Sequence, residues 1–487
     1  MLGLMTIAIS LQIHAQVLSE RAVYERCHAK LVRMTPDADD RLVAQVDSGA
    51  LTGAQACQEL LSLARMNASG RIPPYLANPE KFRTAQRIVH TMNDVHRSWF
   101  TRKTFAAESE CSQSVTNSLI DAAEPAYFFT RALFHPSQLI DSAVLSTDSI
   151  RAIREVENPR RSILRSAITR PFIGFPEEQE MISNGGLLGF ALGSSPMVRL
   201  VATDKAPGEV QLPVVASYPL MQNQGGGILG SQAYLLANFG DDGTLFPDLE
   251  KMPRNWARYV FRDLLCRELP VIRDEDAAPY RVCDSPECAI QVTKAQMANV
   301  LPFRQQNACV KCHASMDQLA GVVRNFRGYR TGTCTFNPPS RFSSYGMVKE
   351  TPTETSISTW DYKVDVNYRK RPSLGRFLFR THNNKLINKP IANLDQLGQV
   401  IANTEDFYIC AAKRYYHYFT GINVDISPLS GALAPDQRFY RARVIDLGRK
   451  LKSADAFNKD SLKLIEAIFA LPEYKRADFR LLQAAGS

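Results

Sequence analysis

One short string in the sequence holds three side chains that can attach a single prosthetic group. Cys309 and Cys312 are separated by two residues and His313 follows directly, so the string reads C-x-x-C-H. Two thiols at this spacing lie on one turn of chain, where each can add to one vinyl group of a porphyrin while the neighbouring imidazole binds the iron. The string therefore predicts one covalent haem c, with Cys309 and Cys312 as anchors and His313 as the proximal iron ligand.

A structural zinc site is the competing interpretation of the same thiols. Cys283 and Cys288 lie upstream and extend the pattern to C-x4-C-x20-C-x2-C, a spacing that four thiolates around a zinc ion could use. In an oxidising compartment, Cys283 and Cys288 more simply close a small disulfide loop. We expect that disulfide and keep zinc as the alternative.

The chain has ten cysteines, and setting aside the two haem thiols leaves eight, an even number that suits a disulfide framework. Cys27 is expected to pair with Cys57, and Cys111 with Cys334 is a candidate for a further pair. The alternative is that several of these residues are buried free thiols.

The start of the chain resembles an export signal. Residues 2–11 (LGLMTIAISL) are apolar and are followed by Ile13-His14-Ala15, a small-residue site of the kind that signal peptidase accepts. Ten residues are too few to span a bilayer, and no later segment reaches the length of a transmembrane helix. No Lys or Arg precedes the run, which leaves a buried first helix of a cytosolic protein as the alternative. We predict a signal peptide over 1–15 and a periplasmic or secreted protein. Haem c is attached outside the bacterial cytoplasm, so export would bring the chain to the compartment where attachment takes place.

The composition is that of a globular chain with enough residues for two to four domains. Of 487 residues, 45% are apolar and 22% are charged, which excludes disorder as a description of the whole chain. The net charge of +9 is spread along the sequence rather than gathered in one block. We therefore expect no nucleic-acid partner.

Apolar periodicity predicts a mainly α, multi-domain protein with a cytochrome c-like helical haem domain and a small β-hairpin element. Three- and four-residue steps predict helices at 79–99, 255–266, 294–300, 407–421 and 461–471. Alternation from Trp360 to Tyr368 predicts a half-buried strand, and Asn383-Asn384 between apolar pairs predicts a hairpin turn. The expected units are a signal peptide (1–15), an N-terminal helical domain (16–135), a Gly/Pro-punctuated mixed domain (136–250), a haem c domain (251–345), a β-hairpin insertion (346–392) and a C-terminal helical domain (393–487).

Two further patterns have simpler structural interpretations. His90 and His96 lie in the helix expected at 79–99, and we interpret them as facing solvent or a partner rather than a second metal. Gly225-x-Gly227-x-x-Gly230 matches a dinucleotide fingerprint in letters, but a poor strand precedes it. We predict a flexible turn that enters a helix at 231–238.

Four strings resemble, in order and content, the exported bacterial proteins called planctomycete-type cytochrome c domain proteins. They are RDLLCRELP (262–270), RQQNACVKCHASMDQLAG (304–321), FYICAAKRYYHYFTG (407–421) and LIEAIFALPEYKRADFR (464–480). The resemblance covers about half of the chain, from 227 to 480. It implies a covalent haem c in a predominantly helical periplasmic protein, with the C-x-x-C-H string as the attachment site.

The resemblance also implies one disulfide, and this sequence differs from the family at two positions near the haem motif. Members of the family tend to have cysteines at the positions of Cys266 and Cys410, which implies that these two are paired. The family usually has Asp-Pro after the haem motif, whereas here Gln318 follows Asp317. An acidic residue usually follows Asn-Phe, and here Arg327 takes that place, so the haem surroundings are expected to differ.

The sixth iron ligand separates the possible functions. Met347, thirty-four residues after His313, is the candidate thioether ligand, and Met297, His382 and His417 remain open. A six-coordinate haem would suit an electron carrier that docks to a redox partner protein in the periplasm or envelope. An open site with a nearby base such as His382 would suit a haem-dependent oxidoreductase or peroxidase. A cell-envelope binding protein with a structural haem is the third possibility. We expect the electron carrier.

Overall fold

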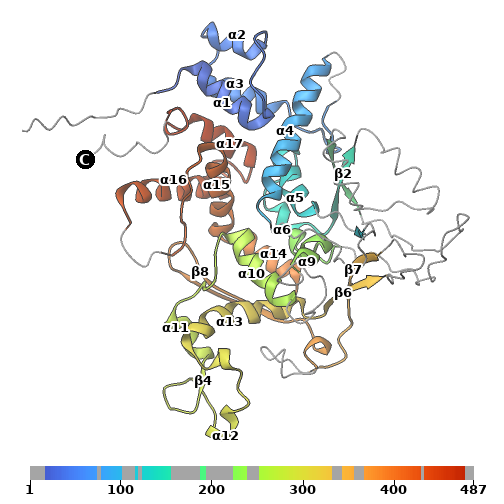
Figure 1. Cartoon of the computed structure of the whole chain (residues 1–487), viewed down its shortest axis with the longest axis vertical. Coiled ribbons are helices and arrows are strands. Elements are labelled where there is room, and N and C mark those ends of the chain that lie inside the picture. Colours follow the sequence, from blue (N-terminus) through green and yellow to red (C-terminus); the bar gives the residue numbers. More distant parts are fainter. Residues whose placement is uncertain are drawn as a thin grey trace, which may run out of the picture.

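The computed structural model describes residues 17–73, 78–100, 116–118, 123–154, 187–193, 223–238, 252–331, 343–355, 367–428 and 433–477 (Figure 1). The signal peptide expected over 1–15 and the Cys111–Cys334 pair lie outside these residues. So does most of the strand expected from Trp360 to Tyr368. Tyr368 itself lies in the 3-10 helix η6 (Tyr368–Lys370) rather than in a strand.

The described chain is mainly helical, as the sequence predicts, and begins with three helices: α1 (Glu20–Val32), α2 (Arg41–Asp47) and α3 (Gly53–Ser62). Each starts after a polar residue whose side chain accepts a hydrogen bond from a backbone N–H of the first turn: Ser19, Asp40 and Thr52. Figure 1 shows α1 and α3 beside the C-terminal helix α17 (Ser461–Ala470), so the two ends of the described chain pack together.

The helix expected at 79–99 is confirmed as α4 (Pro79–Arg97). His90 on this helix is half-buried and lies 3.5 Å from the Asp94 carboxylate. His96 is completely buried, with its ring nitrogens 2.8 Å from the hydroxyl groups of Thr130 and Tyr415. Burial lowers the pKa of His96 to about 3, so the ring is neutral. The expectation that His96 faces solvent or a partner is therefore wrong, because α5 (Glu124–Phe134) and α15 (Glu405–Thr420) cover it.

The described strands form small sheets. β1 (Thr116–Ser118) pairs with β7 (Ser343–Lys349), which also pairs with β6 (Phe326–Thr331); the other pairs are β2 (Ser149–Arg154) with β3 (Leu187–Gly193), β4 (Val282–Cys283) with β5 (Ile290–Gln291), and β8 (Gly375–Arg380) with β9 (Leu386–Ile391). The predicted hairpin is confirmed by the antiparallel pair β8 and β9. Asn384 in its turn has φ of 64°, the left-handed region that Asn tolerates better than most residues.

The glycine-rich turn precedes η2 (Gly227–Gly230) and α9 (Gln232–Ala237), as expected from the sequence. Gly226 and Gly227 have positive φ, and a Cβ on Gly227 would overlap the carbonyl group of Ala143 in α6 (Ser142–Leu145). A tight turn against a neighbouring backbone therefore accounts for these glycines.

The helices near the C-x-x-C-H string are short apart from two. They are α10 (Met252–Leu265), α11 (Asp274–Ala277), η3 (Ala278–Tyr280), α12 (Lys294–Met297), η4 (Pro302–Arg304), α13 (Asn307–Ala320) and η5 (Gly321–Val323). The helix expected at 255–266 is confirmed as α10, whereas the one expected at 294–300 ends earlier, at Met297. Figure 1 shows the segment with β4 and α12 projecting from the rest of the molecule, with α13 at its base.

The C-terminal part is a group of helices packed on one another: α14 (Leu394–Asn403), α15, α16 (Pro435–Lys452) and α17. The helices expected at 407–421 and 461–471 are confirmed as α15 and α17. Gly421 ends α15 with φ of 74°, as a C-cap glycine does. Buried apolar side chains from Val23 to Tyr474 form one contiguous core cluster. None of the helices in the described part of the chain is both long and apolar enough to cross a bilayer.

All three expected disulfides between described cysteines are confirmed. Cys27–Cys57 joins α1 to α3, and Cys283–Cys288 closes the small loop between β4 and β5. The third bond, Cys266–Cys410, joins the end of α10 to the middle of α15. The family resemblance, rather than any spacing rule, suggested this last pair.

Candidate functional site

The residues of the C-x-x-C-H string lie on the first two turns of one helix, α13. Residues three and four positions apart are neighbours on a helix surface, so Cys309, Cys312 and His313 share one face. All three are half-buried, and both cysteines are free thiols. Two unbonded sulfurs and an imidazole are thus presented together on a partly open face.

The opposite face of α13 holds the helix in place. Val310 and Ala314 are completely buried, and the helix packs against α10 and β8. Gly321 follows the helix, and a Cβ there would overlap the carbonyl group of Leu374, the residue before β8. One side of α13 therefore belongs to the core, which leaves the motif side accessible.

The His313 ring is oriented by a buried carboxylate. Its Nδ1 lies 3.0 Å from Oδ2 of Asp317, one turn further along the same helix, and Asp317 is only 3% exposed. A carboxylate has no proton to give, so Nδ1 carries the hydrogen and donates it. In the neutral ring, Nε2 then keeps the lone pair that an iron ligand needs.

Two further groups complete the surroundings of His313. Arg254 on α10 donates from Nη2 to the same Oδ2 of Asp317, at 2.6 Å. The Phe303 ring of η4 stacks on the imidazole with centroids 4.2 Å apart and an interplanar angle of 17°. The Arg254 guanidinium also lies over that ring, 4.9 Å from its centroid. His313 is thereby fixed both in its ring plane and in its tautomer.

Sequence reasoning did not find these supporting residues. Asp317 stands four residues after His313 on a predicted helix, which is a usable signal for a contact. Arg254 and Phe303 come from separate elements, and no local spacing relates them to His313.

The zinc alternative does not agree with the geometry. Cys283 and Cys288 are bonded to each other, which removes two of the four proposed thiolates. Within the part of the chain that the structure describes, no three His, Cys, Asp or Glu side chains gather as a metal site would require.

Among the described side chains, His313 contacts Asp317 and Phe303 and not Met297, His382 or His417. The backbone of Met347 lies in β7 and pairs with Gly328 of β6, the strand that follows α13 and η5. Met297 ends α12, and His417 is exposed on α15. His382 is 6% exposed, and its Nδ1 lies 3.1 Å from Asp406.

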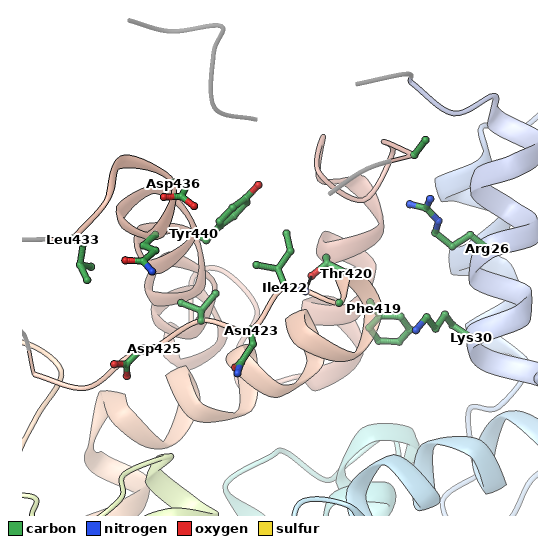
Figure 2. A pocket seen from close by; sticks show the side chains of 14 residues that line it. Arg26, Lys30, Phe419, Thr420, Ile422, Asn423, Asp425, Leu433, Asp436 and Tyr440 are labelled. Atoms are coloured by element: carbon green, nitrogen blue, oxygen red, sulfur yellow. Dashed lines mark hydrogen bonds between the residues drawn. The ribbon is translucent and has the colours of Figure 1, made fainter. Parts of the chain in front are cut away.

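Among the described residues, two cavities lie away from α13. One of about 990 Å³ lies between α1, the end of α15 and α16, with Arg26 and Lys30 on one side and Asp425 and Asp436 on the other (Figure 2). The second, of about 830 Å³, shares Lys30. Residues of α13 line neither of them.

Comparison with other proteins does not extend this description. No family model, curated protein or solved structure matches the chain.

Proposed function

We propose that the protein is an exported c-type cytochrome that carries one covalent haem on α13 and exchanges electrons with a redox partner protein in the periplasm or envelope. The observation that carries this proposal is the common, partly open helix face of Cys309, Cys312 and His313. The free state of both thiols supports it, because thioether formation consumes two unbonded thiols. The resemblance to planctomycete-type cytochrome c domain proteins, which includes three strings outside the C-x-x-C-H string, also supports it.

The residues have distinct parts in this proposal. Cys309 and Cys312 would form the thioether bonds, and His313 would offer Nε2 to the iron. Asp317 holds the ring in the tautomer that leaves Nε2 unprotonated. The bound haem would supply one-electron chemistry between Fe(II) and Fe(III).

The disulfides favour the proposed compartment. Three cysteine pairs are bonded in the described chain, and such bonds persist in the periplasm and outside the cell but are rare in the cytosol. The same compartment is where haem is attached to C-x-x-C-H strings. Export and haem attachment thus support each other.

Electron transfer is favoured over haem enzymology because the described contacts of His382 are with residues outside α13. An enzyme would need a base beside an open iron position. The imidazole of His382 is instead engaged with Asp406 in a buried cluster, and its carbonyl oxygen accepts a hydrogen bond from Arg441 at 3.0 Å. His382, the base that sequence reasoning offered, therefore has no described contact with the residues that would hold the haem.

The haem proposal is tested with paired cysteine variants produced in a host that exports the chain and attaches haem c. The wild type should retain its haem absorbance after extraction with acidified organic solvent, and Cys309→Ser with Cys312→Ser should lose it. Cys283→Ser with Cys288→Ser is the matched control, which should retain haem because that pair is a disulfide. Retention by the first double variant, or zinc bound in place of haem in the wild type, would contradict the proposal.

Met347 is proposed as the sixth ligand. A thioether on the far side stabilises Fe(II) and blocks small ligands. Met347→Ala should therefore lower the reduction potential and open the iron to carbon monoxide, which the wild type should bind slowly or not at all. Immediate binding by the wild type, with spectrum and potential unchanged in the variant, would exclude Met347 and favour an enzyme with an open site.

A further inference from the structure

The contact between His313 and Asp317 has a chemical consequence beyond orientation. A histidine that donates its second N–H to a carboxylate becomes a more basic ligand than one that donates to a neutral acceptor. Hydrogen bonding around the axial ligand is one of the means by which a protein sets a haem potential. Asp317 is 3% exposed, so water does not weaken this interaction as it would at the surface.

Arg254 determines how the carboxylate is held. It contacts Oδ2 of Asp317, the same oxygen that accepts the hydrogen bond from His313. Oδ1 of Asp317 has no hydrogen-bond partner among the described residues. One oxygen thus bears two charge-assisted contacts, and the side chain of Arg254, which is 14% exposed, supplies the positive charge that allows a carboxylate to be buried here.

We propose that Asp317 is a positioning residue that strengthens electron donation from His313 to the haem iron and so keeps the reduction potential low. This inference rests on the proposed function. It assigns to the Arg254–Asp317 pair a role that neither the C-x-x-C-H string nor the sixth ligand provides. Phe303 assists because its stacking on the imidazole holds the ring in the plane in which Nδ1 meets Asp317.

A double variant separates this effect from simple electrostatics. Asp317→Asn alone removes a negative charge near the iron, which raises the potential through space, and it removes the carboxylate that Arg254 contacts. Arg254→Gln combined with Asp317→Asn removes one charge of each sign, so the net charge is unchanged. Its potential should still be higher than that of the wild type, because His313 then donates to a neutral amide.

Asp274→Asn is the matched control for a charge lost near the same helix. Asp274 lies 3.2 Å from Lys311 of α13, is 63% exposed and makes no described contact with His313. Its replacement should shift the potential less than the double variant does. The hyperfine-shifted proton resonances of the His313 ring in the ferric protein should change in the double variant and stay as in the wild type in Asp274→Asn.

The possible results distinguish a failure of the role of Asp317 from a failure of the haem proposal. Equal covalent haem in the wild type and the double variant, with the same potential and the same His313 resonances, would overturn the role of Asp317 and leave the haem proposal standing. Absence of covalent haem from the wild type would overturn the proposed function itself. The hydrogen bond can also be tested in the wild type alone. The Nδ1 proton of His313 should exchange slowly with water because it is donated to Asp317. Fast exchange would overturn the inference.

Discussion

Replacing Cys266 and Cys410 together by serine is expected to lower the free energy of unfolding by about 5 kcal/mol, the value that chain entropy gives for a loop of this length. The two residues are 144 positions apart, so their bond removes much of the freedom of the unfolded chain. The bond also ties α10, which supplies Arg254, to α15. Denaturant unfolding without reductant measures the effect.

The matched control is the described disulfide that closes the shortest loop of chain. Cys283 and Cys288 are 5 positions apart, and their joint replacement by serine should cost about 2 kcal/mol by the same relation. An equal or reversed order of the two double variants would show that loop closure does not govern these bonds.

Asp406→Ala is expected to destabilise the protein by about 3–5 kcal/mol, because it leaves a buried charge without its partner. The side chains of Arg267 and Asp406 are 2% and 0% exposed and are hydrogen-bonded to each other. Burial lowers the pKa of Arg267, which reflects how completely the guanidinium is removed from water. Asp406 also accepts from the backbone N–H of His382 at 2.9 Å, and that donor would lose its acceptor as well.

An exposed ion pair provides the comparison. Asp446 and Lys450 lie 2.9 Å apart on α16 with side chains 50% and 49% exposed, so Asp446→Ala should cost about 0.5 kcal/mol or less. If thermal or denaturant unfolding gave both aspartate variants the same small loss, the buried cluster would not contribute as described.

Local sequence patterns were sufficient to predict the elements whose structure depends on residues close together in the sequence. The apolar stripe of α4, the hairpin turn at Asn384 and the end of α15 at Gly421 each follow from periodicity or from a residue that tolerates positive φ. The same holds for the bond between Cys283 and Cys288, since four intervening residues allow a closed loop.

Contacts between distant segments could not be obtained in this way. The local sequence around His96 indicates an exposed helix residue, whereas the fold buries His96 against α5 and α15. The pairing of β6 with β7, and the approach of Arg254 to Asp317, bring together segments that no spacing rule relates. The C-x-x-C-H string thus predicts the candidate ligands, while the residues that orient His313 are known only from the fold.

The mass of the mature wild-type protein tests the central claim most directly. Purified from a host that attaches haem c, the intact chain should exceed its polypeptide mass by one haem, and after proteolysis that excess should stay on the peptide with Cys309, Cys312 and His313. A mass equal to the bare polypeptide, or an excess of one haem on a different peptide, would contradict the account.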